Sequence, residues 1–516
     1  MLLPAACGTV ADAEAQERAQ DAHAVLARQL ELIRRDGRLD VGIGVIALSS
    51  GIDRLYDRDA VRPLWSDPAA VAGLRQAVRS MDADGLDPAN YHDEIIVNLE
   101  HAVGTPLTAA RLDLIRTDAL IRLTRDLRFG RARSSRLASA ALTEAGAADE
   151  TVTLRRMISS GRLLAEVEAM RPDHPIYQGM RDALAELRRV QRAGGWDALD
   201  AGPALRIDSV DPRVPLLRRR LELEGYMDAG LFDAVRAFQH RHGLNEDGVV
   251  GPATLAALNV PVQARIDQVR VNLERARWIV PGLPDSYLVV NTAGARVYLI
   301  RSGATVFESR AVVGALSTRT PVFHAVLSHV VLNPTWTVPR SIDGEVLTAI
   351  RQDGKYLERN GFRVVDRAGV RIDARRVNFS LYTGATFPYV FVQGPGAANP
   401  LGRIKFVFPN RYNVYLHDTP ARSLFGREQR TFSHGCIRVE DPVRLGSLVL
   451  QWQGRWTPEA ITAAIAAGTT VTIPVSAPLP VLILYWTAAT DLHGELHYYS
   501  DVYGRDAQLL SEIDRR

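Results

Sequence analysis

Cysteine is almost absent from this chain, which has 2 cysteines in 516 residues. A disulfide framework is therefore excluded, because Cys7 and Cys436 could form only one pair. So few thiols are typical of a reducing cytosol or of a periplasm in which stray thiols are avoided, and composition does not choose between them. Most free cysteines are small buried residues, but Cys436 directly follows His434 and Gly435, a context that predicts a reactive thiol.

Long apolar runs are also absent. The longest run, Pro478–Trp486, is far short of the roughly 20 residues that a transmembrane helix needs, so the sequence predicts no membrane span. Charge of one sign is not in large excess either, because the net charge is +3 and is spread along the chain. Aromatic residues make up only 7% and do not alternate with basic runs, so we expect no nucleic-acid partner.

The first residues are similar to the end of a secretion signal. Small residues precede Cys7, but a basic region is absent and the apolar region is very short. Two interpretations stay open. One is a truncated or misassigned start in which Cys7 is a lipidation site, and the other is a short unstructured tail.

The length of 516 residues is too great for one hydrophobic core, so we expect a multidomain α+β protein. Leu112, Ile115, Ala119 and Leu123 recur at helical spacing, whereas Tyr287–Asn291 is typical of a strand. These patterns predict the following units: a helical scaffold over 14–200, a three-helix module over 207–260, a β-rich domain over 284–476 with a partly helical insertion at about 336–385, and C-terminal strands over 477–516 that complete the scaffold or the sheet.

The chemistry is concentrated around Cys436. His417 ends a predicted strand, and residues 418–432 separate it from the motif Ser433–Cys436 (SHGC). The spacer contains Pro420 and Gly426, so we expect it to fold back and place His417 beside Cys436. There His417 would act as general base and accept the thiol proton.

Other residues near the motif are candidates for supporting roles. The imidazole of His417 needs a partner on its second nitrogen, and Asp418 offers both its backbone carbonyl and its carboxylate. The N–H groups of Gly435 and Cys436 are candidates for an oxyanion hole, and His434 for a donor to substrate or to the oxyanion. Arg438 could bind a substrate carboxylate or form a structural bridge, and both interpretations stay open. Two further residues are candidates for lining the substrate path, with core packing as the alternative: Tyr415 and Trp336.

Two segments resemble known families. Residues 207–260 resemble the peptidoglycan-binding repeat module through Asp233–His242, Asp247-Gly248 and Gly251–Thr254. His417, its spacer and Ser433–Cys436 resemble the L,D-transpeptidase catalytic domain of the YkuD type. The resemblance extends to its large periplasmic branch, which has a helical scaffold and a capping subdomain, through these segments: Leu55-Tyr56, Pro63–Trp65, Gly85–Pro88, Asn333–Arg340, Asn399–Arg403, Phe408–Asn410 and His417–Pro420. Some members carry Asn where this chain has Arg438, so no role is transferred to that residue.

The resemblance implies a reaction. Cys436 would attack the carbonyl of the third stem-peptide residue of peptidoglycan and release D-alanine, and a diaminopimelate amine would resolve the thioester into a 3→3 cross-link. Water, a D-amino acid or a protein lysine stays open as the acceptor. The resemblance also implies acylation by carbapenems, no metal or cofactor, a Gram-negative periplasmic location, and stem peptides, glycan and other wall-synthesis enzymes as partners.

Two rival functions remain. A zinc peptidase or amidase would use His417, His434 and Cys436 as ligands, but the sequence has no HExxH motif and no second ligand cluster. A wall-binding scaffold with a degenerate catalytic domain is disfavoured by the intact His417 and Cys436.

Overall fold

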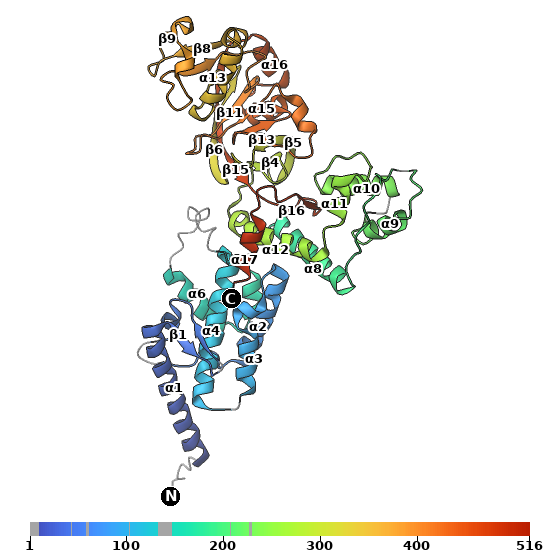
Figure 1. The fold of residues 1–516 in the computed structure, drawn as a ribbon. Coiled ribbons are helices and arrows are strands. Elements are labelled where there is room, and N and C mark those ends of the chain that lie inside the picture. The colour runs from blue at the N-terminus through green and yellow to red at the C-terminus, as the bar shows by residue number, and fades with distance from the viewer. Residues whose placement is uncertain are drawn as a thin grey trace, which may run out of the picture.

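The computed structural model describes residues 10–42, 44–57, 61–102, 104–132, 147–206, 208–226 and 230–515. Figure 1 shows a helical N-terminal part, a small helical unit at one side and a β-rich part at the far end. This confirms the predicted multidomain α+β class. Cys7 lies outside the described residues, so its lipidation stays a prediction. Within the described residues, every helix is too short or too polar to cross a membrane.

The N-terminal part packs around one long helix, α4 (Pro106–Phe129). The Thr105 hydroxyl caps α4 by accepting from Thr108 N–H, and Pro106 suits its first turn. The predicted stripe is buried, with Ile115 and Leu123 fully inaccessible. The other elements of this part are α1 (Val10–Asp36), β1 (Arg38–Asp40), β2 (Val45–Ala47), α2 (Pro68–Ser80), α3 (Asp93–His101), α6 (Ala147–Ser159), α7 (Leu163–Glu168) and α8 (Pro175–Arg192).

The small unit has three helices, α9 (Val214–Glu222), α10 (Leu231–Arg241) and α11 (Pro252–Leu258). Gln239 on α10 holds the following loop, because its amide nitrogen donates to Asp247 Oδ1 at 2.9 Å and its amide oxygen accepts from Gly248 N–H at 2.9 Å. Gly248 has φ +69, and a Cβ there would lie 2.1 Å from the Phe232 ring. The residues that resemble the peptidoglycan-binding module therefore stabilise the fold of this small unit.

The long helix α12 (Val262–Ile279) packs along α8 and leads into the β-rich part. There a nine-stranded sheet runs in the order β13-β5-β14-β12-β11-β6-β15-β3-β4. Because β5 also pairs with β4, the sheet closes into a barrel filled by apolar side chains. The strands are β3 (Tyr287–Asn291), β4 (Arg296–Arg301), β5 (Ala304–Gly314), β6 (Phe323–Leu332), β11 (Ile404–Val407), β12 (Leu416–His417), β13 (Thr431–Ser433), β14 (Ile437–Val439) and β15 (Val471–Leu484), and α15 (Pro442–Leu450) and α16 (Pro458–Ala466) follow β14.

The predicted insertion forms a cap with its own sheet, ordered β7-β10-β8-β9. Its aromatic core includes Phe387 and Phe391, whose rings stack at 4.5 Å. This sheet includes β10, so the cap extends beyond the expected limit of 385. The elements of the cap are β7 (Trp336–Thr337), α13 (Asp343–Gln352), α14 (Tyr356–Arg359), β8 (Phe362–Val365), β9 (Arg371–Ile372) and β10 (Val390–Gln393).

The C-terminal segment differs from the expected run of strands. After β15, the hairpin β16 (Ala488–Thr490) and β17 (Leu496–Tyr498) pairs with itself and not with the barrel. The chain then ends in a helix, α17 (Asp506–Ile513). Leu509 and Ile513, four residues apart, are buried in the core of the N-terminal part, and this apolar spacing explains the helix.

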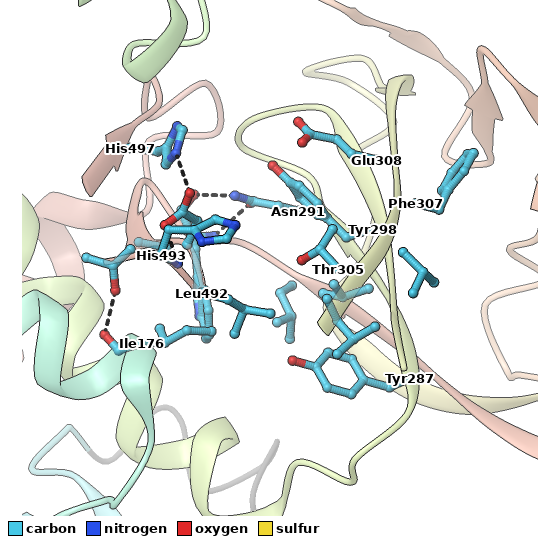
Figure 2. A pocket seen from close by; sticks show the side chains of 18 of the residues that line it. Ile176, Tyr287, Asn291, Tyr298, Thr305, Phe307, Glu308, Leu492, His493 and His497 are labelled. Atoms are coloured by element: carbon cyan, nitrogen blue, oxygen red, sulfur yellow. Dashed lines mark hydrogen bonds and ion pairs between the residues drawn. The ribbon is translucent and has the colours of Figure 1, made fainter. Parts of the chain in front are cut away.

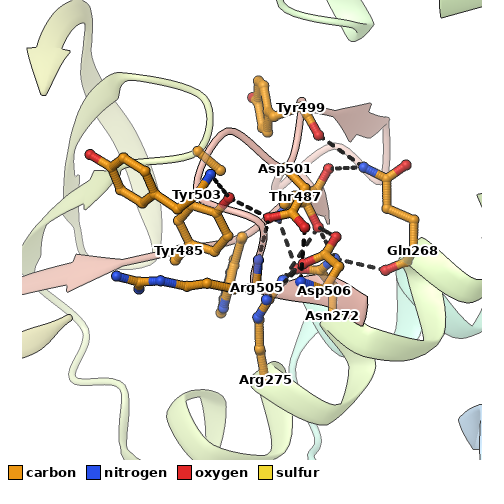
Figure 3. Close-up of polar contacts among 12 residues, drawn as sticks. Gln268, Asn272, Arg275, Tyr485, Thr487, Tyr499, Asp501, Tyr503, Arg505 and Asp506 are labelled. Carbon is orange, nitrogen blue, oxygen red and sulfur yellow. Dashed lines mark hydrogen bonds and ion pairs between the residues drawn. The ribbon is translucent and has the colours of Figure 1, made fainter. Parts of the chain in front are cut away.

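A polar network fastens this segment to α12, as Figure 3 shows. Arg275 on α12 pairs with Asp506 at 2.7 Å, and Asn272 accepts from Thr487 N–H at 3.0 Å. Tyr503 links the segment to the barrel, because its hydroxyl donates a hydrogen bond to the Gly314 carbonyl at the end of β5 at 2.7 Å. The N-terminal part is thereby tied to the end of β5.

Candidate active site

The SHGC motif forms a tight loop between β13 and β14. The Ser433 hydroxyl donates to the Cys436 carbonyl at 2.5 Å and accepts from Gly435 N–H at 3.1 Å. Gly435 has φ +110, a backbone conformation that L side chains rarely adopt. Ser433 and Gly435 therefore shape the loop that presents Cys436.

A second loop, after β5, supports this one. The Thr318 hydroxyl donates to the Ser433 carbonyl at 2.9 Å, and the Thr320 hydroxyl donates to the Gly435 carbonyl at 2.9 Å. The Tyr503 hydroxyl in turn accepts from Thr320 N–H at 3.4 Å. The sequence analysis missed Thr318 and Thr320, because nothing local marks two threonines 115 residues from the motif they hold.

The approach to β12 explains the Phe408–Asn410 motif. The Asn410 side chain closes the loop, with its amide nitrogen donating to the Val414 carbonyl at 2.7 Å and its oxygen accepting from Val414 N–H at 3.2 Å. Asn413 adopts φ 58, and its carbonyl accepts from Cys436 Sγ at 3.8 Å. The loop thus reaches the thiol directly.

The register of β12 and β14 decides which residue flanks the cysteine. The strands are parallel, and His417 lies opposite Arg438. Ile437 N–H donates to the Tyr415 carbonyl at 3.1 Å, which places Tyr415 beside Cys436. No hydrogen bond of the described residues joins His417 to Cys436. Since side chains two residues apart share a face, His417 is a diagonal neighbour of Cys436 on that face.

The partner of the imidazole is the backbone carbonyl of Asp418. His417 Nδ1 donates to that carbonyl at 2.5 Å. The Asp418 carboxylate instead accepts from Arg403 N–H at 2.9 Å and from the Arg422 guanidinium at 3.3 Å. Gly402 leaves room for the Asp418 carboxylate, because a Cβ at position 402 would lie 2.3 Å from Asp418 Oδ2. Burial, together with the positive charge of Arg438, lowers the pKa of His417 to about 3, so the ring is neutral at physiological pH.

The thiol is partly exposed and has two cationic neighbours. Burial raises the pKa of Cys436, while hydrogen bonds from Tyr415 and the positive charges of Lys405 and Arg438 lower it. Lys405 Nζ lies 3.8 Å from the centroid of the Tyr415 ring, and Lys405 pairs with His417 across β11 and β12. The sequence analysis missed Lys405, although it is the one charged residue in the strand Ile404–Val407.

Arg438 does not form the structural bridge considered above. Its Nε is buried without a hydrogen-bond partner. Within the part of the chain that the structure describes, neither Arg438 nor Lys405 has a carboxylate in ion-pair distance. Two cations next to a thiol and without counter-ions make this face electropositive and suited to an anionic group.

The cap touches the motif through His434. His434 Nε2 lies 3.0 Å from Glu345 Oε1 on α13, and both side chains are about half exposed. Trp336 lies in the cap and packs against Phe362, with ring centroids 6.1 Å apart. The structure therefore places Trp336 in the aromatic core of the cap.

The three residues of the alternative zinc site, His417, His434 and Cys436, do not form a cluster with metal-ligand spacing among the described residues. Among the described residues, one group of three metal-type side chains has its ligand atoms within 4.8 Å of one another, and it consists of Asp491, Glu495 and His497. It contains none of His417, His434 and Cys436, so the ligand set of a zinc peptidase is not assembled around this thiol.

Comparisons with known proteins agree with the domain order. Residues 285–473 match the family described as "L,D-transpeptidase catalytic domain" (YkuD). Residues 50–184 match "Scaffold domain", and residues 216–258 match "Putative peptidoglycan binding domain". A Haemophilus influenzae protein named "Putative L,D-transpeptidase" is 34% identical over 249 residues, which are 48% of this chain and 50% of that protein. The chain thus spans about half the length of this curated relative.

Solved structures give weaker likenesses. An L,D-transpeptidase from Xylanimonas cellulosilytica is 16% identical, with 55% of this chain and 99% of that chain covered and a TM-score of 0.20. One from Stackebrandtia nassauensis is 12% identical, with 56% and 96% covered and a TM-score of 0.21. These TM-scores are too low to show that the whole chain has the fold of either structure. The family matches carry the assignment of segments: residues 285–473 match the YkuD catalytic domain of L,D-transpeptidases, and matches to a scaffold domain and to a peptidoglycan-binding domain precede them in the chain.

Proposed function

We propose that this protein is a peptidoglycan L,D-transpeptidase in which Cys436 is the nucleophile. The observation that carries the proposal is the setting of Cys436: a partly exposed thiol in a braced loop, flanked by Tyr415 and by two cations without counter-ions. The matches to a catalytic domain and to a peptidoglycan-binding domain support this substrate class.

In the proposed first step, the thiolate attacks the carbonyl carbon of the third stem-peptide residue. His417 is the candidate base: its Nδ1–H is held by the Asp418 carbonyl, so the neutral ring keeps Nε2 as its proton acceptor. The carbon–nitrogen bond then breaks, the leaving amine takes the proton, and D-alanine departs. A thioester on Cys436 remains.

The oxyanion would be held by one backbone donor rather than by the two expected. Gly435 N–H already donates to the Ser433 hydroxyl. Cys436 N–H makes no hydrogen bond with the described residues, so it is the free donor next to the reacting carbon. We assign the oxyanion contact to Cys436 N–H, and we assign to His434 a contact with the cap through Glu345.

The two cations suit a carboxylate of the donor peptide. Lys405 and Arg438 lie on the sheet face that also carries Tyr415 and His417. An anionic stem peptide would supply the counter-ion that both side chains lack among the described residues. The same charges would favour the thiolate over the thiol.

The second step transfers the acyl group to an amine. A diaminopimelate side-chain amine would attack the thioester, form an amide and return the thiol, which gives a 3→3 cross-link. Water, a free D-amino acid or a protein lysine is the alternative acceptor. Action on the wall places the enzyme outside the cytoplasmic membrane, in the periplasm if the cell is Gram-negative, with other wall-synthesis enzymes as candidate partners.

The test is intact-protein mass spectrometry after mixing the full chain with a carbapenem. We expect one covalent adduct on the wild type and none on Cys436→Ala. A tetrapeptide donor and a diaminopimelate-containing acceptor should then give a cross-linked product with the wild type alone. Absence of the adduct, or its persistence in Cys436→Ala, would contradict the proposal.

A further inference from the structure

A cavity of about 440 Å³ lies outside the active site. Figure 2 shows it on the outer face of β3, β4 and β5, with the turn after β16 and the end of β17 on its other side. Helix α8 contributes Ile176 and α10 of the small helical unit contributes His240. The volume is within the range of small-molecule sites, and a junction of domains is a common place for them.

The cavity contains polar groups that lack partners. Tyr287 is 5% exposed, and Figure 2 shows its phenol directed from β3 toward the cavity. Its hydroxyl makes no hydrogen bond with the described residues, and burial raises the pKa of Tyr287 to about 12, so it stays a donor. The indole N–H of Trp486, a second lining residue at 8% exposure, also lacks a partner among the described residues. Neither atom is among the buried side-chain atoms that lack a partner, so both open on the cavity and are available to a ligand there.

The lining indicates the chemistry of that ligand. Apolar side chains such as Val289 and Leu492 form part of the wall, and the charged lining residues are Asp491, Glu308 and Arg444. Glu308 pairs with Arg296, and Asp491 lies 3.7 Å from His497, so the lining offers no excess of positive charge to an anion. Burial lowers the pKa of His497, so this imidazole both donates and accepts while neutral. A neutral ligand with hydroxyl groups and apolar faces fits best.

The position of the cavity indicates where such a ligand would come from. Arg241 on α10 pairs with Glu495 of the hairpin at 2.9 Å, and His242 stacks on Tyr498 with ring centroids 5.1 Å apart. The helical unit matched as peptidoglycan-binding is therefore docked on the hairpin that walls the cavity. A glycan strand held by that unit would pass close to the opening.

We propose that this cavity binds an uncharged N-acetylhexosamine unit of the peptidoglycan glycan strand. The Tyr287 hydroxyl and the Trp486 N–H would donate to the sugar, and Asp491 would accept from its hydroxyl groups. The inference rests on the proposed function, because it takes peptidoglycan as the substrate. It adds a sugar subsite separate from Cys436.

The test is titration of the full chain with the uncharged trimer of β-1,4-linked N-acetylglucosamine, followed by calorimetry. We expect saturable binding by the wild type. Tyr287→Phe, which removes one hydroxyl, should weaken it about fivefold, since a neutral hydrogen bond contributes about 1 kcal/mol. Ala489→Phe, which fills the cavity from β16, should abolish binding. Tyr389→Phe in the cap is the matched control and should bind like the wild type.

Absence of binding by the wild type would overturn the inference, and so would equal binding by the wild type, Tyr287→Phe and Ala489→Phe. Carbapenem acylation of Cys436, measured on the same samples, separates this inference from the proposed function. An adduct without sugar binding removes the subsite only. Sugar binding without an adduct removes the transpeptidase proposal and leaves a glycan site.

Discussion

Charged side chains in two regions of this molecule have opposite surroundings. In the N-terminal part, Asp84 is fully buried and accepts from Arg171 at 2.8 Å and from Tyr177 at 3.0 Å. Arg277 and Glu274, both inaccessible, pair at 2.7 Å. Around Cys436, by contrast, Lys405 and Arg438 have no carboxylate partner among the described residues.

This difference distinguishes charges that stabilise the fold from charges that are available to a reacting group. A buried charge is costly unless it is paired, so the scaffold supplies each charge with partners from its own chain. At the thiol, the described residues leave two cations without counter-ions, and under the proposed function a thiolate or a substrate would supply the missing negative charge. The predictions below test whether removing a charge in one region affects stability and in the other reactivity.

The largest effect should come from His417→Ala. The loss of the base should slow acylation by a carbapenem by about 10²- to 10⁴-fold. Iodoacetamide should still modify Cys436, because alkylation needs only the thiolate. Time courses by intact-mass spectrometry measure both rates. His324→Ala, an exposed histidine on β6, is the control, and an unchanged acylation rate in His417→Ala would refute the role of base.

Asp84→Ala should destabilise the scaffold by about 3–5 kcal/mol, because it leaves Arg171 buried without its carboxylate. The measurement is urea unfolding of the transition that includes the N-terminal part. Asp82→Ala removes a carboxylate that is 56% exposed and pairs with Arg188, so it should change stability by less than about 1 kcal/mol. Equal effects of the two variants would contradict the contrast drawn here.

Lys405→Met should raise the pKa of the Cys436 thiol, because a cation that favours the thiolate is lost. Below that pKa the thiolate fraction falls as the pKa rises, so alkylation near pH 8 should be slower than in the wild type. The pH dependence of the iodoacetamide rate measures the shift. Lys355→Met, on the exposed surface of the cap, should leave the profile unchanged, and an unshifted profile for Lys405→Met would remove Lys405 from the site.

The smallest effect should come from Glu345→Gln. It removes the charge from the contact between Glu345 on α13 and His434, and both side chains are about half exposed, so this contact contributes less than about 1 kcal/mol. We expect slightly faster hydrogen exchange in α13 at low salt and no difference at high salt, where the pair is screened. A large change that persists at high salt would show that Glu345 acts through something other than this pair.

Much of the barrel could be predicted from sequence because its strands are marked locally. Tyr287–Asn291 is predicted as a strand and forms β3, and in the insertion that is predicted to be partly helical, Asp343–Gln352 forms α13. The strands predicted over 477–516 are only partly present. The end of β15, through Leu484, joins the sheet, whereas Leu509 and Ile513 lie on one face of helix α17, which packs in the distant N-terminal part.

The sequence by itself determined the candidate nucleophile and the shape of its loop, because the cues are adjacent: Cys436 follows Gly435, which needs a positive φ, and Ser433 bonds within the same loop. Only the tertiary structure decided the surroundings. Strand register put Tyr415 rather than His417 beside the thiol and brought Lys405 into range. Thr320, Tyr503 and the cavity at Tyr287 join segments far apart in the chain, and pairing across such distances leaves no local pattern to read.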